Sequence, residues 1–198
     1  MSGEDGAHEH RHEHGGQSTR GLIDPKKLLQ KVGVKQGDVM LDVGCGDGFI
    51  SIEAAKDFVG PSGMVHATDV DPSAIAKVTK QIDELGLKNI DATEADATKA
   101  ILLDDHVVDT CIIANVLHGF VVNREIDGIF SELLRVMKPG GKVAIIEFKK
   151  SKRFPGPPYE DRLAPADVEA MFDQHGSTRI ATFNPGVLHY ARVFQITA

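Results

Sequence analysis

The stretch Leu41-Asp-Val-Gly-Cys-Gly-Asp-Gly-Phe49 decides the fold of this chain. It begins inside a short apolar run, residues 39–43, and ends where apolar residues take up helical spacing. Glycines at such a junction let the chain turn sharply and let a ligand approach the backbone without Cβ atoms in the way. The stretch therefore predicts a buried strand, a ligand-binding loop and a helix, in that order.

The glycine spacing and the acidic residue before it bear on the kind of ligand. Dinucleotide-binding loops follow the pattern G-x-G-x-x-G, with the pyrophosphate at the helix N-terminus, whereas the glycines here stand at positions 44, 46 and 48. A carboxylate at Asp42 would repel a pyrophosphate, so the loop favours a ligand with a positive centre and an adenosine-like body. A nicotinamide dinucleotide oxidoreductase remains the alternative within enzymes.

Outward from this loop, apolar runs alternate with helical patterns. Strands alternating with helices indicate right-handed crossovers and a parallel sheet covered on both faces. The fold class expected is α/β, a Rossmann-like doubly wound seven-stranded sheet, mostly parallel with an antiparallel C-terminal hairpin. The pattern predicts strands over residues 39–43, 64–68, 90–94, 107–114, 142–148, 178–183 and 189–196, helices over 25–32, 49–58, 72–85, 123–136 and 165–175, and a tight turn over 138–141.

Residues 1–20 differ from the rest of the chain. They consist largely of Gly, His, Glu and Ser without apolar periodicity, so we expect a disordered His-rich tail, and one domain over residues 21–198. Four histidines alternate with other residues, and imidazole is a common ligand of zinc, nickel and copper. The tail is therefore either weakly metal-binding or a solvated polar arm, and a non-catalytic metal-handling protein is the alternative outside enzymes. The four are His8, His10, His12 and His14.

Composition excludes several classes of protein. With 41% hydrophobic and 26% charged residues, the chain has the composition of a globular domain. Two cysteines cannot form a disulfide framework or a four-cysteine zinc site, so a cytoplasmic location is expected. The net charge of -7 argues against nucleic acid or an anionic membrane as partner, and no window approaches the roughly 20 apolar residues of a membrane span.

Five collinear segments together resemble the class I S-adenosylmethionine-dependent methyltransferases. The sequence is similar to the small-molecule branch, with the ubiquinone, menaquinone and arsenite methyltransferases as its nearest kinds. The resemblance implies S-adenosylmethionine as cofactor, a small molecule as methyl acceptor, and residues 21–198 as the methyltransferase domain. The segments are residues 41–49, Ala67-Thr-Asp-Val-Asp-Pro72, Glu94-Ala-Asp-Ala97, residues 108–118 and Leu134-Arg-Val-Met-Lys-Pro-Gly-Gly-Lys142.

The resemblance also implies a cofactor-binding set along the carboxyl edge of the sheet, near the switch point between the first and fourth strands. Two carboxylate oxygens suit the vicinal hydroxyls of a ribose, since each accepts a hydrogen bond. The implied roles are Asp42 under the methionine portion with the backbone of Gly44, Cys45, Gly46 and Gly48, Asp69 on the ribose, Val70 on adenine, Asp96 and Ala97 near the adenine amine, and Asn115 at the methyl end.

His118 is the candidate catalytic base, because the loop after the fourth strand faces the methyl group in this fold. Loss of a proton from an O or N acceptor needs such a base, and a structural loop histidine is the alternative. Glu147 is expected at the same edge. Tyr159 and Arg162 are expected either in a lid or acceptor clamp or in a surface crossover.

Differences between this sequence and the motifs of related families disfavour two classes of methyl acceptor. Arsenite methyltransferases hold the metalloid with several cysteines, whereas Cys45 is expected to pack in the glycine loop and Cys111 in an apolar strand. No metal ligand is predicted in the site. The Asn-Pro-Pro-Tyr motif of DNA and protein-glutamine methyltransferases is absent after the fourth strand, which disfavours a nucleic-acid substrate.

Overall fold

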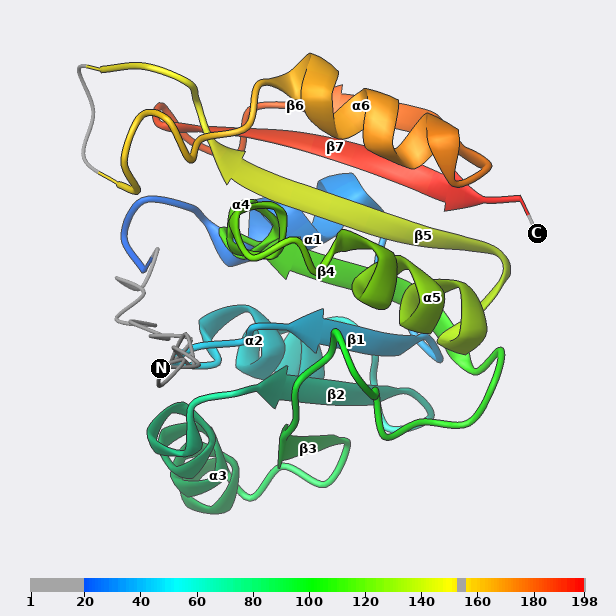
Figure 1. Cartoon of the computed structure of the whole chain (residues 1–198). Helices are drawn as coiled ribbons and strands as arrows, with labels where there is room; N and C mark the ends of the chain where they lie inside the picture. Colours follow the sequence, from blue (N-terminus) through cyan, green and yellow to red (C-terminus); the bar gives the residue numbers. More distant parts are fainter. Residues whose placement is uncertain (1–19, 153–155, 198) are drawn as a thin grey trace, which may run out of the picture.

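The computed structural model describes residues 20–152 and 156–197, and within them one seven-stranded sheet forms the centre of the molecule (Figure 1). The strand order is β3-β2-β1-β4-β5-β7-β6. Strands β1 to β5 are parallel, while β7 is antiparallel to both β5 and β6. The expected fold class is therefore confirmed. The order reverses between β1 and β4, which is the switch point where ligands of such sheets bind.

The elements follow the sequence-based prediction closely. The strands are β1 Val39–Val43, β2 Met64–Asp69, β3 Ile90–Glu94, β4 Val108–Ala114, β5 Met137–Phe148, β6 Ser177–Phe183 and β7 His189–Ile196. The helices are α1 Pro25–Val32, α2 Phe49–Asp57, α3 Pro72–Leu85, α4 Leu117–Val122, α5 Ile126–Val136 and α6 Pro165–Gln174.

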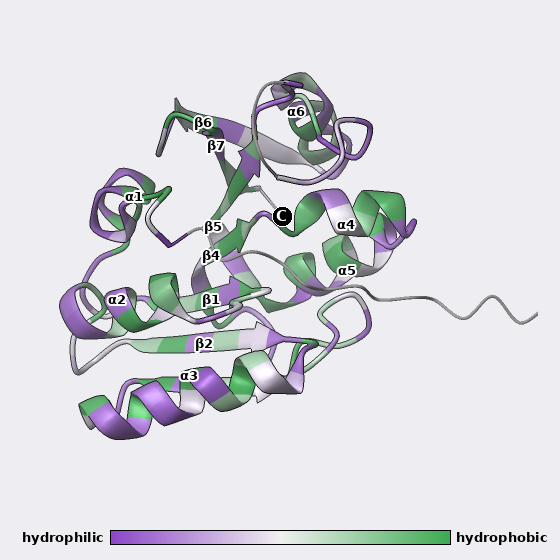
Figure 2. Ribbon diagram, turned by 90° about the vertical axis from the view of Figure 1, so that its left-hand side faces the viewer, coloured by the Kyte–Doolittle hydropathy of each residue, from purple (hydrophilic) through white to green (hydrophobic). Residues whose placement is uncertain are grey.

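Helices cover both faces of the sheet. Figure 2 shows α1, α2 and α3 on one side and α4, α5 and α6 on the other. Two apolar clusters correspond to these layers, one containing Leu28 of α1 and Ile50 of α2, the other containing Leu133 of α5 and Phe172 of α6. Since side chains alternate across a strand, β1, β4, β5 and β7 each contribute to both clusters, and this explains the nearly continuous apolar runs of β1, β4 and β5.

Local signals set the boundaries of α1 and α3. Each helix has proline at its first position and an aspartate before it whose side chain accepts a backbone hydrogen bond: Asp24 from Lys27 N–H, and Asp71 from Ser73 N–H. Each also ends at a glycine in the left-handed region. Asp71 is therefore a helix cap, as predicted.

The single helix predicted over residues 123–136 is wrong at its start. The structure has two helices here, because α4 begins at Leu117 and α5 only at Ile126. Between them the backbone of Arg124 adopts φ +62°, which breaks the helical path. The sequence predicts a loop in place of α4, since six residues are too few to display helical periodicity.

The tight turn predicted over residues 138–141 is also wrong, because these residues belong to β5. Val108 of β4 pairs with Met137 and Thr110 pairs with Lys142, so the four residues 138–141 lie opposite one residue of β4, Asp109. Gly140 has φ +80°, which a β-branched residue would resist. The insertion is therefore a bulge in a continuous strand, a distinction that depends on pairing and not on local sequence.

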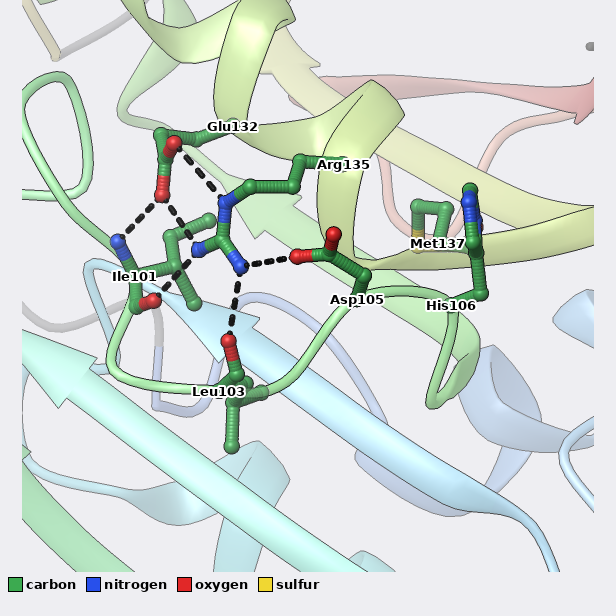
Figure 3. Close-up of polar contacts among 7 residues, drawn as sticks. All are labelled: Ile101, Leu103, Asp105, His106, Glu132, Arg135 and Met137. Atoms are coloured by element: carbon green, nitrogen blue, oxygen red, sulfur yellow. Dashed lines mark hydrogen bonds and ion pairs between the residues drawn. The ribbon is translucent and has the colours of Figure 1, made fainter.

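A network of polar contacts holds the segment between β3 and β4, which has no helix (Figure 3). The Arg135 guanidinium donates to the carbonyls of Ile101 at 2.7 Å and Leu103 at 2.8 Å, and to Asp105 at 2.9 Å. Glu132 accepts from Arg135 at 2.6 Å and from Ile101 N–H at 2.7 Å. Two side chains of α5 thus satisfy backbone groups of a segment that also contains two predicted site residues, Asp96 and Ala97.

The predicted His-rich tail, with its four histidines, lies outside the described residues except for Arg20. None of the helices in the described ranges is long and apolar enough to cross a membrane.

Candidate active site

The glycine loop after β1 is anchored to the end of β2. The N–H groups of Gly44 and Cys45 donate to the carbonyl of Thr68 at 2.8 and 3.0 Å, and Gly48 N–H donates to Cys45 carbonyl at 2.9 Å. Gly44, Gly46 and Gly48 all have positive φ, at +69°, +55° and +73°. The loop is thus a rigid turn held by its own backbone and by the neighbouring strand.

The three glycines have different surroundings. A Cβ atom on Gly44 would lie 2.4 Å from Val116, and one on Gly48 would lie 2.7 Å from Val78, so both positions exclude side chains by packing within the protein. A Cβ atom on Gly46 would meet nothing within 4 Å. The loop is therefore open at Gly46, which is where a ligand can approach the backbone.

Asp69 ends β2 and links three parts of the site. Its carboxylate accepts from Gly46 N–H at 2.9 Å and from Asp71 N–H at 2.9 Å, one bond to each oxygen. Each carboxylate oxygen has a second lone pair, so Asp69 retains one acceptor position per oxygen. This arrangement fits the predicted contact with two neighbouring ribose hydroxyls.

Asp42 is buried beneath the loop on the α2 side of the sheet, with 2% exposure. It accepts a hydrogen bond of 2.5 Å from the hydroxyl of Ser51, in the first turn of α2. Burial raises the pKa of Asp42 to about 7, and the charges of Asp69 and Asp47 act in the same direction. A cation above the loop would stabilise the charged form of this carboxylate.

The residues predicted around adenine lie beyond β2 and β3. Val70 is 40% exposed, which is unusual for valine and leaves its side chain free to pack on a flat apolar group. Ala97 is buried. Asp96 accepts from both the N–H and the hydroxyl of Thr98, and it pairs with Lys99 at 2.8 Å. Partial burial opposes charge on Asp96, but these partners outweigh it and lower its pKa.

Asn115 follows β4 in a strained conformation. Its φ is +58°, and its N–H donates to Ile146 carbonyl at 2.8 Å. Both polar atoms of its side-chain amide are buried and make no hydrogen bond within the described residues. A buried amide without partners costs roughly 1–3 kcal/mol, and strained residues of this kind cluster at functional sites. Asn115 is therefore suited to bind a polar ligand.

His118 lies in the first turn of α4 and contacts Glu147, near the end of β5. The ring Nδ1 is 3.0 and 3.1 Å from the two carboxylate oxygens, and the backbone N–H of His118 donates to Oε1 at 3.1 Å. Glu147 is 1% exposed. Burial alone would lower the pKa of His118, but the hydrogen bond and charge of Glu147 outweigh burial and raise it.

In the segment after β5, the side chain of Arg162 is hydrogen-bonded to backbone carbonyls of the same segment. This side chain is buried, and it donates to the carbonyls of Pro157 at 2.8 Å and Ser151 at 2.7 Å. Arg162 therefore supports the loop from within, whereas Tyr159 is 39% exposed at its surface. Of the two, Tyr159 is the better placed to meet a ligand.

The remaining sequence-predicted residues have structural roles. Cys45 and Cys111 are buried and unpaired, and burial together with the charge of Asp42 raises the pKa of both thiols. Neither is thus a nucleophile. Asp109 accepts from Val39 N–H and pairs with Lys138 at 2.8 Å, at the opposite edge of the sheet.

Two further residues became visible only in the structure. Ser51 bonds Asp42, and the signal for it was a polar residue among the apolar positions of α2. His189 is fully buried beside the ring of Phe148, and neither ring nitrogen has a hydrogen-bond partner in the described part of the chain. Burial lowers the pKa of His189 to about 4, so its imidazole is neutral. The position of His189 at the start of a strand does not indicate that its side chain is buried without a hydrogen-bond partner.

The described residues contain no group of three or more His, Cys, Asp or Glu side chains that could hold a metal ion. What they do contain is an open glycine, acceptor carboxylates, an exposed valine and an unpartnered amide along the carboxyl edge of β1, β2 and β4. These groups fit the parts of S-adenosylmethionine: a diol, a flat base and a cationic amino acid. Fold and site together define a class I S-adenosylmethionine-dependent methyltransferase.

Comparison with known proteins agrees with this class. Residues 34–182 match the methyltransferase domain family, and the chain belongs to that family. An S-adenosylmethionine-dependent methyltransferase from Aquifex aeolicus has a similar structure, with a TM-score of 0.82 and 31% identity over 91% of this chain and 94% of that one. The family, the enzyme class and the cofactor expected from the sequence are thus confirmed.

Two curated relatives share part of their length with this chain. A demethylmenaquinone methyltransferase of Lactobacillus johnsonii is 35% identical over 123 residues, which are 62% of this chain and 48% of that protein. The ubiquinone/menaquinone biosynthesis C-methyltransferase UbiE of Pseudomonas putida is 33% identical over 127 residues, which are 62% of this chain and 46% of the relative. This chain spans about half the length of these relatives.

Proposed function

We propose that the protein transfers a methyl group from S-adenosylmethionine to a small-molecule acceptor. The cofactor contacts proposed are Asp42 with the backbone of the glycine loop, Asp69 for the ribose, Val70, Asp96 and Ala97 for adenine, and Asn115 for the methionine end. His118 is the proposed base. The observation that carries the proposal is the combination of the open Gly46 with the unpartnered side-chain amide of Asn115.

Bound S-adenosylmethionine supplies an electrophilic methyl carbon on a positively charged sulfur. The protein has little covalent chemistry to perform, because the leaving group is neutral, so its residues mainly align the acceptor and exclude water. Asp42 is buried and bonded to Ser51, and its charge favours the cationic ligand. His118 lies three residues beyond Asn115, at the start of the helix that follows β4, which supports a base near the methyl end of the cofactor.

Isothermal titration with S-adenosylhomocysteine tests the proposal. We expect binding to the full chain, and a loss of at least tenfold in affinity for Asp69→Ala. The matched control is Asp91→Ala, since Asp91 is also on the β2–β3 side of the sheet but pairs with His66. Absence of binding by the folded protein, or equal affinity of Asp69→Ala and the wild type, would contradict the proposal. Titration with a nicotinamide dinucleotide tests the alternative enzyme class.

We propose in addition that residues 1–20 bind divalent metal weakly and outside the catalytic site. The support is the alternation of four histidines over positions 8–14. Titration of Ni²⁺ into the full chain and into a chain lacking residues 1–16 tests this, and retention of binding by the shortened chain would contradict it. If the full chain binds metal but transfers no methyl group to any tested acceptor, the result would favour a non-catalytic metal-handling protein.

We propose a cytoplasmic location and an acceptor other than nucleic acid. The two unpaired cysteines support the first statement, and the net charge of -7 supports the second. Fractionation of cells that produce the protein checks the location. A methylation assay with DNA and RNA, run beside small acceptors, checks the substrate.

A further inference from the structure

We propose that His118 and Glu147 act as one unit, in which Glu147 positions the imidazole, and that this unit takes the proton of a protic acceptor, an O–H or N–H that loses its proton during transfer. The inference rests on the proposed function and specifies the class of its acceptor. It assigns to Glu147 a positioning role, and it predicts that the substrate is not an acceptor that needs no base, such as a thiolate or a metalloid oxyanion.

The contacts between the two residues set the orientation of the imidazole. A carboxylate only accepts hydrogen bonds, so His118 Nδ1, at 3.0 and 3.1 Å from the two oxygens, carries the hydrogen. Nε2 is then the unprotonated nitrogen of the neutral ring, and it makes no hydrogen bond with any described residue. The third contact, from His118 N–H to Oε1 at 3.1 Å, fixes the start of α4 to the same carboxylate.

Glu147 and His118 differ in how far their side chains are buried. The side chain of Glu147 is 1% exposed and that of His118 is 19% exposed, so the carboxylate is hidden and the imidazole is reachable. Glu147 pairs in the sheet with Tyr190, whose hydroxyl donates to Leu163 carbonyl at 3.0 Å and not to Glu147. A buried carboxylate whose described partner is one histidine is costly for stability. A residue that costs stability beside an open site is better explained by function than by the fold.

His118 Nε2 takes the proton of the acceptor, and the electron pair of the acceptor atom forms the bond to the methyl carbon. The bond between that carbon and sulfur breaks with its electron pair on sulfur, which loses its positive charge. The positive charge passes to the imidazole, which Glu147 stabilises, and His118 then releases the proton to water.

The proposed base makes kcat/KM depend on pH. Glu147 raises the pKa of His118, Asp161 adds to that effect, and Arg162 and burial oppose it. The base is active when deprotonated, so kcat/KM increases with pH through a pKa above the ordinary value. In Glu147→Gln the main raising cause is removed and burial dominates, so the acid limb of the profile moves to lower pH while the maximum rate falls.

The experiment uses the full chain and a set of four variants: His118→Gln, Glu147→Gln, the double variant, and His66→Gln as control. S-adenosylhomocysteine is added to saturation for NMR and left out of the methyl-transfer assay. His66 forms a similar pair with Asp91, at 3.0 Å, away from the carboxyl edge. Nitrogen-15 NMR measures the tautomer and pKa of His118. Methyl transfer from S-adenosylmethionine is followed with phenol, benzylamine, 2-mercaptoethanol and arsenite as probes.

We expect His118 to carry its hydrogen on Nδ1 and its pKa to fall in Glu147→Gln. Methylation of phenol or benzylamine should fall by about 10²–10⁴-fold in His118→Gln and less in Glu147→Gln. The double variant should resemble His118→Gln, because the residues act as a unit. The control should resemble the wild type.

Three results would overturn the proposal while leaving the proposed cofactor intact: a hydrogen on Nε2, turnover confined to the thiol or arsenite, or no phenol or amine product from protein that binds S-adenosylhomocysteine. Retained binding of S-adenosylhomocysteine by Glu147→Gln shows that the variant is folded. Failure of every variant and of the wild type to bind it would instead contradict the proposed function.

Discussion

The backbone N–H of Gly46 lies 2.9 Å from the carboxylate of Asp69, so the glycine loop after β1 is hydrogen-bonded to the end of β2. The carbonyl of Thr68 adds two further bonds to the same loop. These contacts hold the loop with groups of the protein itself, and a loop held in this way loses less conformational entropy when a ligand binds.

Replacing Gly46 should change both the free energy of unfolding, through backbone strain, and the ligand affinity, through loss of space for the ligand. Gly46→Ala should lower the free energy of unfolding by about 1–2 kcal/mol, because φ is +55°, and it should reduce the affinity for S-adenosylhomocysteine at least tenfold. Gly86→Ala is the matched control, since Gly86 has φ +65° and also has nothing within 4 Å of its Cβ position. Denaturant unfolding and calorimetric titration measure both effects. Similar affinities for the two variants would show that no ligand approaches Gly46.

The buried carboxylate of Asp42 predicts a pH-dependent affinity. Its pKa is about 7 because of burial and the neighbouring Asp69 and Asp47, so below pH 7 a cationic ligand must displace a proton. Affinity for S-adenosylmethionine, whose sulfur is positively charged, should therefore fall by up to about tenfold per pH unit below 7 and level off above it. Asp42→Asn should bind weakly with little change between pH 5.5 and 8. A wild-type affinity that does not change over this range would contradict the prediction.

The same carboxylate predicts a stability effect of opposite sign. The pKa of Asp42 is raised from 3.8 in the unfolded chain to about 7 in the folded protein, so the unfolded chain binds fewer protons between these values. Stability should fall as pH rises through that window. Asp42→Asn should therefore raise the free energy of unfolding at pH 8 by roughly 1–3 kcal/mol. Urea unfolding measures it, and equal stability of the two proteins at pH 8 would contradict the expectation.

Asn115 should likewise gain stability when its strain is removed. Asn115→Gly relieves φ +58° and eliminates the unpartnered amide, so the free energy of unfolding should rise by about 1 kcal/mol while the affinity for S-adenosylhomocysteine falls. Arg124→Gly is the control, because Arg124 has φ +62° in the turn between α4 and α5. It should gain stability without losing affinity. A stability loss in Asn115→Gly would argue against stored strain at the site.

The polar network around Arg135 is expected to be structural. Arg135→Met leaves the carbonyls of Ile101 and Leu103 without their donor, and it should lower the free energy of unfolding by about 1–3 kcal/mol. Lys80→Met serves as control, since the exposed pair between Lys80 and Glu84 should contribute at most about 0.5 kcal/mol. Thermal unfolding compares the two variants. A change in Arg135→Met no larger than in the control would contradict the role of the network.

Much of the fold could be predicted because its signals are local. Asp24 with Pro25 and Asp71 with Pro72 begin helices, and an apolar run before glycines is a buried strand wherever it occurs. The boundaries of α4, α5 and β5 could not be predicted in this way. Whether residues 138–141 turn or bulge depends on the register of β5 against β4, where Met137 pairs with Val108, 29 residues earlier in the sequence.

The candidate site also has features that local sequence predicts and features that depend on tertiary contacts. The sequence by itself determined the residue types at the strand ends, the glycine loop and the single cationic cofactor that they suit, since these follow from short motifs and their order. Only the tertiary structure decided which side chains are bonded and which are without a partner: His118 with Glu147, Asp42 with Ser51, and the side-chain amide of Asn115 with no partner among the described residues. The reason is physical, because burial and hydrogen bonding depend on segments that meet only when the sheet is assembled, and these set the protonation and orientation of each group.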